Sequence, residues 1–155
     1  MQYRAASGKL DSSLVHSKLN DIFASAPNTP EKLRALWALQ VTGGLSRDRL
    51  GELLTHDSEH VRGWAIQFLC DPSTINAFQP ERNAGWKLEA RILRRFAVMA
   101  RVDPSPIVRL NLASAVQRLP FSQRWSILEG LVSHEEAVSD NNLPRKNKTP
   151  TKAAK

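Results

Sequence analysis

Cysteine, long apolar runs and strand-like alternation are all scarce or missing in this sequence. Cys70 is the only cysteine among 155 residues. The chain therefore holds no internal disulfide, no multi-cysteine zinc site and no Cys-x-x-Cys-His haem attachment. No apolar run approaches the ~20 residues that a membrane-spanning helix needs, and residues 1–10 lack the apolar segment of a signal peptide. The position of Cys70 at the end of an apolar helix face predicts a small buried side chain.

Net positive charge is missing from the central part of the chain, although the whole sequence carries a formal net charge of +7. The C-terminal segment 145–155 contains no acid and five basic residues, Arg145, Lys146, Lys148, Lys152 and Lys155. The segment before residue 21 supplies the remaining excess, so residues 21–144 are neutral overall. Basicity of the whole chain is therefore no argument for nucleic-acid binding by a folded domain.

The clearest element in the sequence is a helix within residues 103–120. Asp103 or Ser105 can accept hydrogen bonds from the first turn, and Pro104 or Pro106 suits the first helical position. One face of this helix is apolar and Pro120 ends it. The residues of that face are Val108, Leu112, Ala115, Val116 and Leu119.

Similar spacing and punctuation predict about seven helices and no strand, which makes the chain all-α. Thr29 is the predicted N-cap of the second helix, with Pro30 as its first residue, and Gly43-Gly44 is its predicted end. The connection 72–85 has little pattern. The other helices are expected at 11–25, 46–54, 58–71, 86–101 and 121–133.

A repeated feature links three of these helices. An apolar residue followed by arginine stands near the start of each, as Leu33-Arg34, Val61-Arg62 and Val108-Arg109. Paired helices with this pattern resemble the HEAT repeat, whose hairpins stack because one hairpin alone cannot bury its apolar face. The sequence thus predicts a HEAT-repeat α-solenoid of about three helical hairpins over residues 11–144. Residues 1–10 are expected to be flexible, and 145–155 to form a disordered basic tail.

Several motifs carry a narrower resemblance. They are LRALWAL (33–39), TGGL (42–45), HVRGWAI (60–66), DPSPIVRL (103–110), ASAVQRLP (113–120), RW (124–125) and NLP (142–144). In this order they resemble the HEAT region of a bacterial family classed as membrane-bound dehydrogenases. Members of that family join a β-propeller similar to sugar dehydrogenases, a central HEAT region and a C-terminal c-type cytochrome module.

The chain departs from that family outside the HEAT region. After NLP it continues with Arg145-Lys146-Asn147-Lys148, where the family continues with apolar helices. No family residue that acts in catalysis or binds haem has a counterpart, so we expect no catalytic, cofactor-binding or metal-binding residue in this chain. The resemblance implies a fragment of a larger protein of the cell envelope, while the residues themselves leave the compartment open.

Two sets of charged residues are candidate sites. Asp57 with Arg62, and Asp103 with Arg109, are predicted to form an Asp–Arg ladder between stacked repeats, because a planar guanidinium can join carboxylates bidentately. Loss of Arg109 would then lower thermal stability. The second set is a basic stripe on helix 86–101, with acidic relief on that helix only from Glu89. It consists of Lys87, Arg91, Arg94 and Arg95.

Two further patterns favour structural roles. His56 and His60 have the spacing of a zinc-binding pair, but Asp57 replaces the glutamate of that motif and no third ligand stands nearby. We therefore interpret this segment as a polar turn between repeats. The four tryptophans stand on or beside apolar faces and are predicted to belong to the core. They are Trp37, Trp64, Trp86 and Trp125.

Three functional hypotheses follow from these observations. The first is a non-catalytic scaffold that contacts a protein partner through its concave helix faces. The second is a nucleic-acid-binding module that uses the basic stripe. The third, by family association, is a dehydrogenase or electron-transfer enzyme. Terminal repeats that leave apolar faces uncovered also predict self-association.

Overall fold

The computed structural model describes residues 12–71 and 87–134, and every regular element in these ranges is a helix. Seven α-helices and one 3-10 helix occur there, which confirms the all-α prediction. They are α2 (Ser12–Ser25), α3 (Thr29–Thr42), α4 (Arg47–Leu53), α5 (Glu59–Leu69), α7 (Ala90–Val102), α8 (Pro106–Val116), η2 (Phe121–Gln123) and α9 (Trp125–Val132). The predictions for segments 1–10, 72–85 and 145–155 lie outside the described residues.

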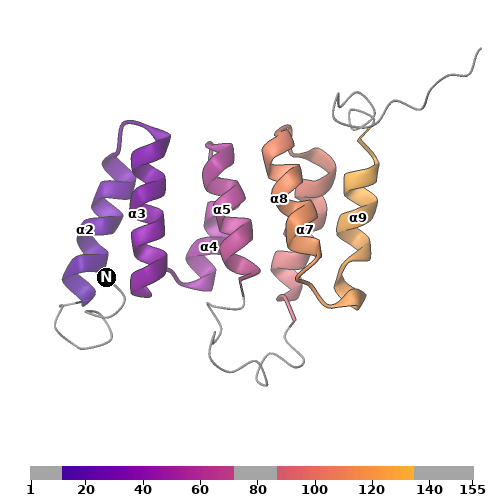
Figure 1. The fold of residues 1–155 in the computed structure, drawn as a ribbon, viewed down its shortest axis with the longest axis horizontal. Helices are drawn as coiled ribbons and strands as arrows, with labels where there is room; N and C mark the ends of the chain where they lie inside the picture. Colours follow the sequence, from indigo (N-terminus) through magenta and orange to yellow (C-terminus); the bar gives the residue numbers. More distant parts are fainter. Residues whose placement is uncertain (1–11, 72–86, 135–155) are drawn as a thin grey trace, which may run out of the picture.

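The helices pack in pairs that follow one another along the long axis of the molecule (Figure 1). Helix α2 packs on α3, α4 on α5, and α7 on α9. Helices α3, α5 and α8 also contact one another in that order. These three helices carry the apolar-arginine pair near their starts. The repeated sequence feature therefore marks helices that are neighbours in space.

Local sequence explains where most of these helices begin and end. The Ser46 side chain accepts a hydrogen bond from the Arg49 N–H at 3.1 Å, and Ser105 accepts one from the Val108 N–H. Gly43 ends α3 in the left-handed conformation, with φ of 77°, which glycine adopts without strain. The predicted cap of α3 was wrong by one residue. Asn28, rather than Thr29, accepts a hydrogen bond from the Glu31 N–H at 3.0 Å.

Helix α7 begins at Ala90, four residues after the predicted start at Trp86. The reason is a contact with the segment between α8 and α9. The Leu88 N–H donates to Gln123 Oε1, and Gln123 Nε2 donates to the Leu88 carbonyl, both at 2.8 Å. This pairing holds Leu88 outside the helix. Gln123 itself belongs to η2, so α9 also starts later than expected, at Trp125.

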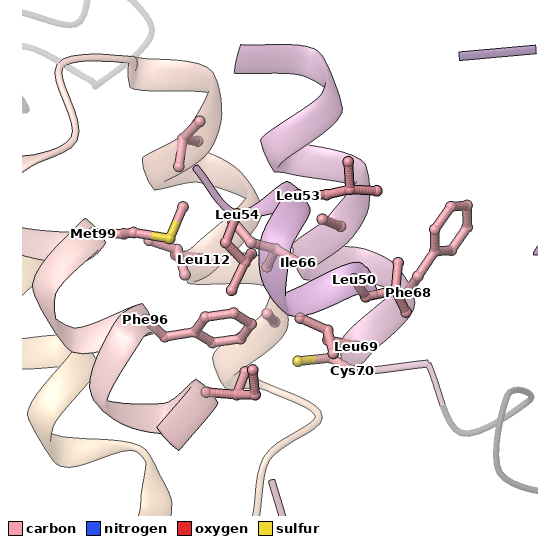
Figure 2. Packing of buried hydrophobic residues seen from close by; sticks show 14 of the residues in the cluster. Leu50, Leu53, Leu54, Ile66, Phe68, Leu69, Cys70, Phe96, Met99 and Leu112 are labelled. Carbon is pink, nitrogen blue, oxygen red and sulfur yellow. The ribbon is translucent and has the colours of Figure 1, made fainter. Parts of the chain in front are cut away.

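The core lies between the paired helices and runs through the described part of the chain. Figure 2 shows Phe96 and Met99 of α7 pointing toward Leu54 and Ile66, with Cys70 at the edge of the same cluster. Burial raises the pKa of the Cys70 thiol to about 12. The prediction of a buried cysteine is therefore confirmed.

The predicted burial of the tryptophans was wrong for the three that the structure describes. Trp37, Trp64 and Trp125 are 41%, 37% and 57% exposed. In α5, the buried residues Val61, Ala65 and Phe68 form a complete apolar stripe without Trp64. The indole of Trp64 therefore lies on the flank of α5. Trp86 lies outside the described residues.

Candidate interaction surfaces

A buried ion pair joins α5 to the turn between α7 and α8. Arg62, in the first turn of α5, donates through Nε to Asp103 Oδ2 and through Nη2 to Asp103 Oδ1, both at 2.9 Å. The two side chains are only 13% and 7% exposed. A bidentate pair of this kind fixes both the distance and the relative angle of the segments that it joins.

The remaining ladder residues surround this pair through main-chain groups. Arg62 Nη1 donates to the carbonyls of His56 and Asp57, at 2.8 and 2.9 Å. Arg109 Nη1 donates to the Asp103 carbonyl at 2.9 Å. The sequence named the pairs Asp57–Arg62 and Asp103–Arg109 for a ladder between neighbouring repeats. The structure instead joins Arg62 of α5 to Asp103, which precedes α8.

Ser105 and Glu59 complete this junction. The Ser105 N–H donates to Asp103 Oδ1 at 3.0 Å, and the Ser105 hydroxyl donates to the Glu59 carboxylate. Ser105 also caps α8. The same few residues thus set the start of α8 and attach it to α5.

The basic stripe is partly neutralised by acids from two elements. Arg91 binds Asp48 of α4 and also Glu89, the latter at 2.9 Å, and Arg47 of α4 binds Glu89 at 3.0 Å. Hydrogen bonds from Arg91 and then Arg47 lower the pKa of Glu89. Bonds to Asp48 and then Glu89 raise the pKa of Arg91. These contacts attach α4 to the start of α7.

The other members of the stripe are exposed. Arg94 and Arg95 stand on α7, whereas Lys87 precedes that helix. The sequence indicated Glu89 as the acid on the same helix as the stripe. Asp48 of α4, which is 43 residues away from Arg91 in sequence, binds Arg91 as well. No local pattern in the sequence reveals that contact.

His56 has a structural contact with the start of α5. Its Nδ1 accepts a hydrogen bond from the Ser58 N–H at 3.0 Å, and its ring meets Phe23 edge-on, with centroids 5.8 Å apart. Burial, followed by the charge of Lys32, lowers its pKa. Among the described residues, no three His, Cys, Asp or Glu side chains are grouped to hold a metal ion.

An aromatic surface, which sequence reasoning missed, covers one side of α3, α5 and α8. Trp37 and Trp64 meet edge to face at its centre, with ring centroids 5.1 Å apart. We call the surface around them, including His60, Ile107 and Asn111, the tryptophan face. A sequence signal for it exists, since Trp64 shares its stripe of α5 with polar residues at positions 60, 67 and 71.

Hydrogen bonds between side chains hold the part of this face formed by α5 and α8. Gln67 Nε2 donates to Asn111 Oδ1 at 2.9 Å, and Asn111 Nδ2 donates to the Ile107 carbonyl at 2.8 Å. Gly63 permits this approach, because a Cβ at that position would lie 2.8 Å from Asn111 Nδ2. The floor of the face is therefore formed by fixed side chains.

Two hollows adjoin the tryptophans. One, of about 480 Å³, lies between α5 and α8 beside Trp64, Gln67 and Ile107. The other, of about 460 Å³, lies beside Pro30 and Trp37 of α3. His60 lines both hollows.

No family model, curated protein or solved structure matches the chain. Within residues 12–71 and 87–134, no helix is both long and apolar enough to span a bilayer.

Proposed function

We propose that this chain is a non-catalytic HEAT-like scaffold that binds a protein partner. The observation that carries the proposal is that the three helices with the same sequence feature pack side by side, with an ion pair joining two of them. Helices α3, α5 and α8 are neighbours, and the Arg62–Asp103 pair links α5 to the start of α8. Such a junction suits a solenoid, in which each repeat is stabilised mainly by the next one along the chain.

The motifs shared with the HEAT region of the membrane-bound dehydrogenase family support a further part of the proposal. We propose that this chain corresponds to the HEAT region of a larger protein, in which propeller and cytochrome modules would carry the redox chemistry. The role of the present residues is then to position partners. The purified chain should show no haem absorbance and should not reduce an electron-accepting dye when sugars are added. Either signal would contradict the non-catalytic proposal.

The nucleic-acid alternative has less support from the electrostatics. Arg91, at the centre of the basic stripe, is bound to two carboxylates, and Arg47 beside it is bound to one. Protein cations bind phosphates by displacing the counterions of the nucleic acid, and these two arginines already bind carboxylates of the chain itself. Arg94 and Arg95 remain as the exposed cations of the stripe on α7.

Site-specific photo-crosslinking in the native host separates the two functions. A benzophenone side chain is placed at position 64 on α5 or at position 94 on α7. We expect one discrete protein adduct from position 64 and none from position 94. A nucleic-acid adduct from position 94 would favour the alternative, and no protein adduct from either position would contradict the scaffold proposal.

A further inference from the structure

We propose that the hollow between α5 and α8 binds a neutral sugar ring. This inference goes beyond the scaffold function and does not depend on it. The hollow combines an aromatic wall, side-chain amides with unused hydrogen-bonding capacity and a balanced charge. These features match a pyranose, which has an apolar C–H face and hydroxyls that both donate and accept hydrogen bonds.

The aromatic wall of the hollow comes from α5. Trp64 and Phe68 both line it, one helical turn apart, with ring centroids separated by 5.4 Å. Trp64 remains 37% exposed although it contacts both Phe68 and Trp37. Aromatic rings attract the weakly positive C–H bonds of a ligand through the negative charge of their faces. A sugar ring can therefore lie with its C–H face toward this wall.

The polar side of the hollow is formed by the amides of Gln67 and Asn111. Gln67 Nε2 donates to Asn111 Oδ1, and Asn111 Nδ2 donates to the Ile107 carbonyl. Among the described residues, Gln67 Oε1 accepts no hydrogen bond, and each amide nitrogen donates only one. The pair therefore still offers a carbonyl acceptor and two N–H donors. Neutral groups of both kinds match hydroxyls better than they match a charged ligand.

The charges that line the hollow are balanced. Arg118 and Asp71 line it together, and no other Arg, Lys, Asp or Glu of the described residues does so. A ligand with a net charge of either sign would be attracted by one of them and repelled by the other. A neutral ligand can use both, because a hydroxyl accepts from the guanidinium and donates to the carboxylate.

The geometry favours a sugar over a nucleobase, although the size of the hollow admits either. Its volume of about 480 Å³ lies within the ~300–1,000 Å³ of small-molecule pockets. Bases bind by stacking their flat faces on aromatic rings. The rings of Trp64 and Phe68 are inclined at 38°, and those of Trp37 and Trp64 at 73°, so neither pair forms a slot with parallel walls. A puckered sugar ring needs no such slot.

Saturation-transfer NMR with the full chain tests this proposal. The probes are the methyl glycosides of glucose, mannose, galactose and N-acetylglucosamine, and adenosine is the comparison ligand. We expect saturation of the ring protons of at least one glycoside and none of adenosine. In an NMR titration with that glycoside, the dissociation constant should rise at least about tenfold for Trp64→Ala. It should rise about two- to tenfold for Gln67→Met, which removes the amide but nearly keeps the size of the side chain.

The matched controls are Trp125→Ala on α9 and Gln40→Met on α3, because neither residue lines the hollow. Both should leave the dissociation constant within about twofold of the natural chain. Circular dichroism verifies that each variant folds, and Gln67→Met carries the test if Trp64→Ala does not fold. Saturation of no glycoside, saturation of adenosine, or equal weakening by the control variants would overturn the inference.

Discussion

Arg62 is the residue whose loss should weaken the structure most directly. It donates four hydrogen bonds, two of them to the buried Asp103 carboxylate. Arg62→Ala leaves that carboxylate buried without its partner, which costs about 3–5 kcal/mol of unfolding free energy in comparable cases. Urea unfolding measured by circular dichroism tests this. The matched control is Arg34→Ala, at the equivalent exposed position of α3, which should change stability by less than about 0.5 kcal/mol.

A double substitution separates the cost of an orphaned charge from the value of the pair. Arg62→Met together with Asp103→Leu removes both charges, and we expect it to be more stable than Arg62→Ala. If Arg62→Ala were as stable as Arg34→Ala, the α5–α8 junction would not depend on this ion pair.

His56 should make stability dependent on pH. Its pKa is lowered by burial and by Lys32, against the opposing effect of Asp57, whereas in the unfolded chain it is about 6.5. At pH values between these two pKa values, the unfolded chain takes up a proton that the folded chain does not. The free energy of unfolding should therefore be highest above about pH 6.5 and fall as the pH decreases toward the lowered pKa.

Urea unfolding at pH 7.5, 6.5 and 5.5 measures this dependence. His56→Asn keeps an oxygen that can accept from the Ser58 N–H, and it removes the titrating group, so it should flatten the profile. His60→Asn, which makes the same substitution at the exposed histidine four residues later, is the control. An unchanged slope in His56→Asn would show that another group causes the pH dependence.

At the scale of elements, the close approach of α9 to α7 depends on Gly130. A Cβ at this position would lie 2.8 Å from Ala100 Cβ and 3.1 Å from the Ala100 main-chain carbon. Gly130→Ala should therefore destabilise the protein by about 1–3 kcal/mol, although alanine favours a helix by ~1 kcal/mol over glycine. Guanidinium unfolding provides the measurement.

The control for this prediction is Gly51→Ala in α4. The atom that its Cβ would meet is Ile92 Cδ1 at 3.1 Å, the end of a flexible side chain. We expect this variant to be as stable as the natural chain or slightly more stable. If both substitutions destabilised the protein equally, the close approach of α9 to α7 would not be the cause of the effect of Gly130→Ala.

Helix boundaries were predictable from sequence wherever a local signal sets them. Ser46, Ser105 and Gly43 act within a few residues of their own positions, and the helices there begin or end as expected. The start of α7 was not predictable, because Gln123 is 35 residues away from Leu88. Local patterns report periodicity and caps, whereas a contact from a distant segment leaves no trace in them.

The candidate sites likewise combine features that local sequence reveals with contacts that it does not. The sequence pointed to Arg62 and Asp103 as ladder residues, but their pairing spans 41 positions and emerges only when α5 and α8 pack. The tryptophan face was missed because hydrophobicity was equated with burial. In α5 a complete apolar stripe was already present, and the residue left over had to lie on the surface.

At the scale of the whole molecule, no helix of residues 12–71 or 87–134 covers the two ends of the row. Helix α9 lies at one end and α2 at the other (Figure 1). Trp125 and Val132 of α9 are 57% and 80% exposed, and Leu14 and Ile22 of α2 are about half exposed. Stacked helices bury such faces against the next repeat, so a second copy that places α2 against α9 is the occupant we expect.

Head-to-tail contacts form open filaments unless the rotation between copies closes a ring. Assembly should therefore grow with concentration. Sedimentation velocity should show a mean mass that rises between micromolar and near-millimolar protein, and Val132→Lys should shift this rise to higher concentration. Val98→Lys is the matched control, because Val98 is 52% exposed on α7 and lies away from the ends. A monomer at every concentration, or equal effects of the two lysines, would mean that the terminal helices do not associate, and their apolar residues would then be available to a different protein.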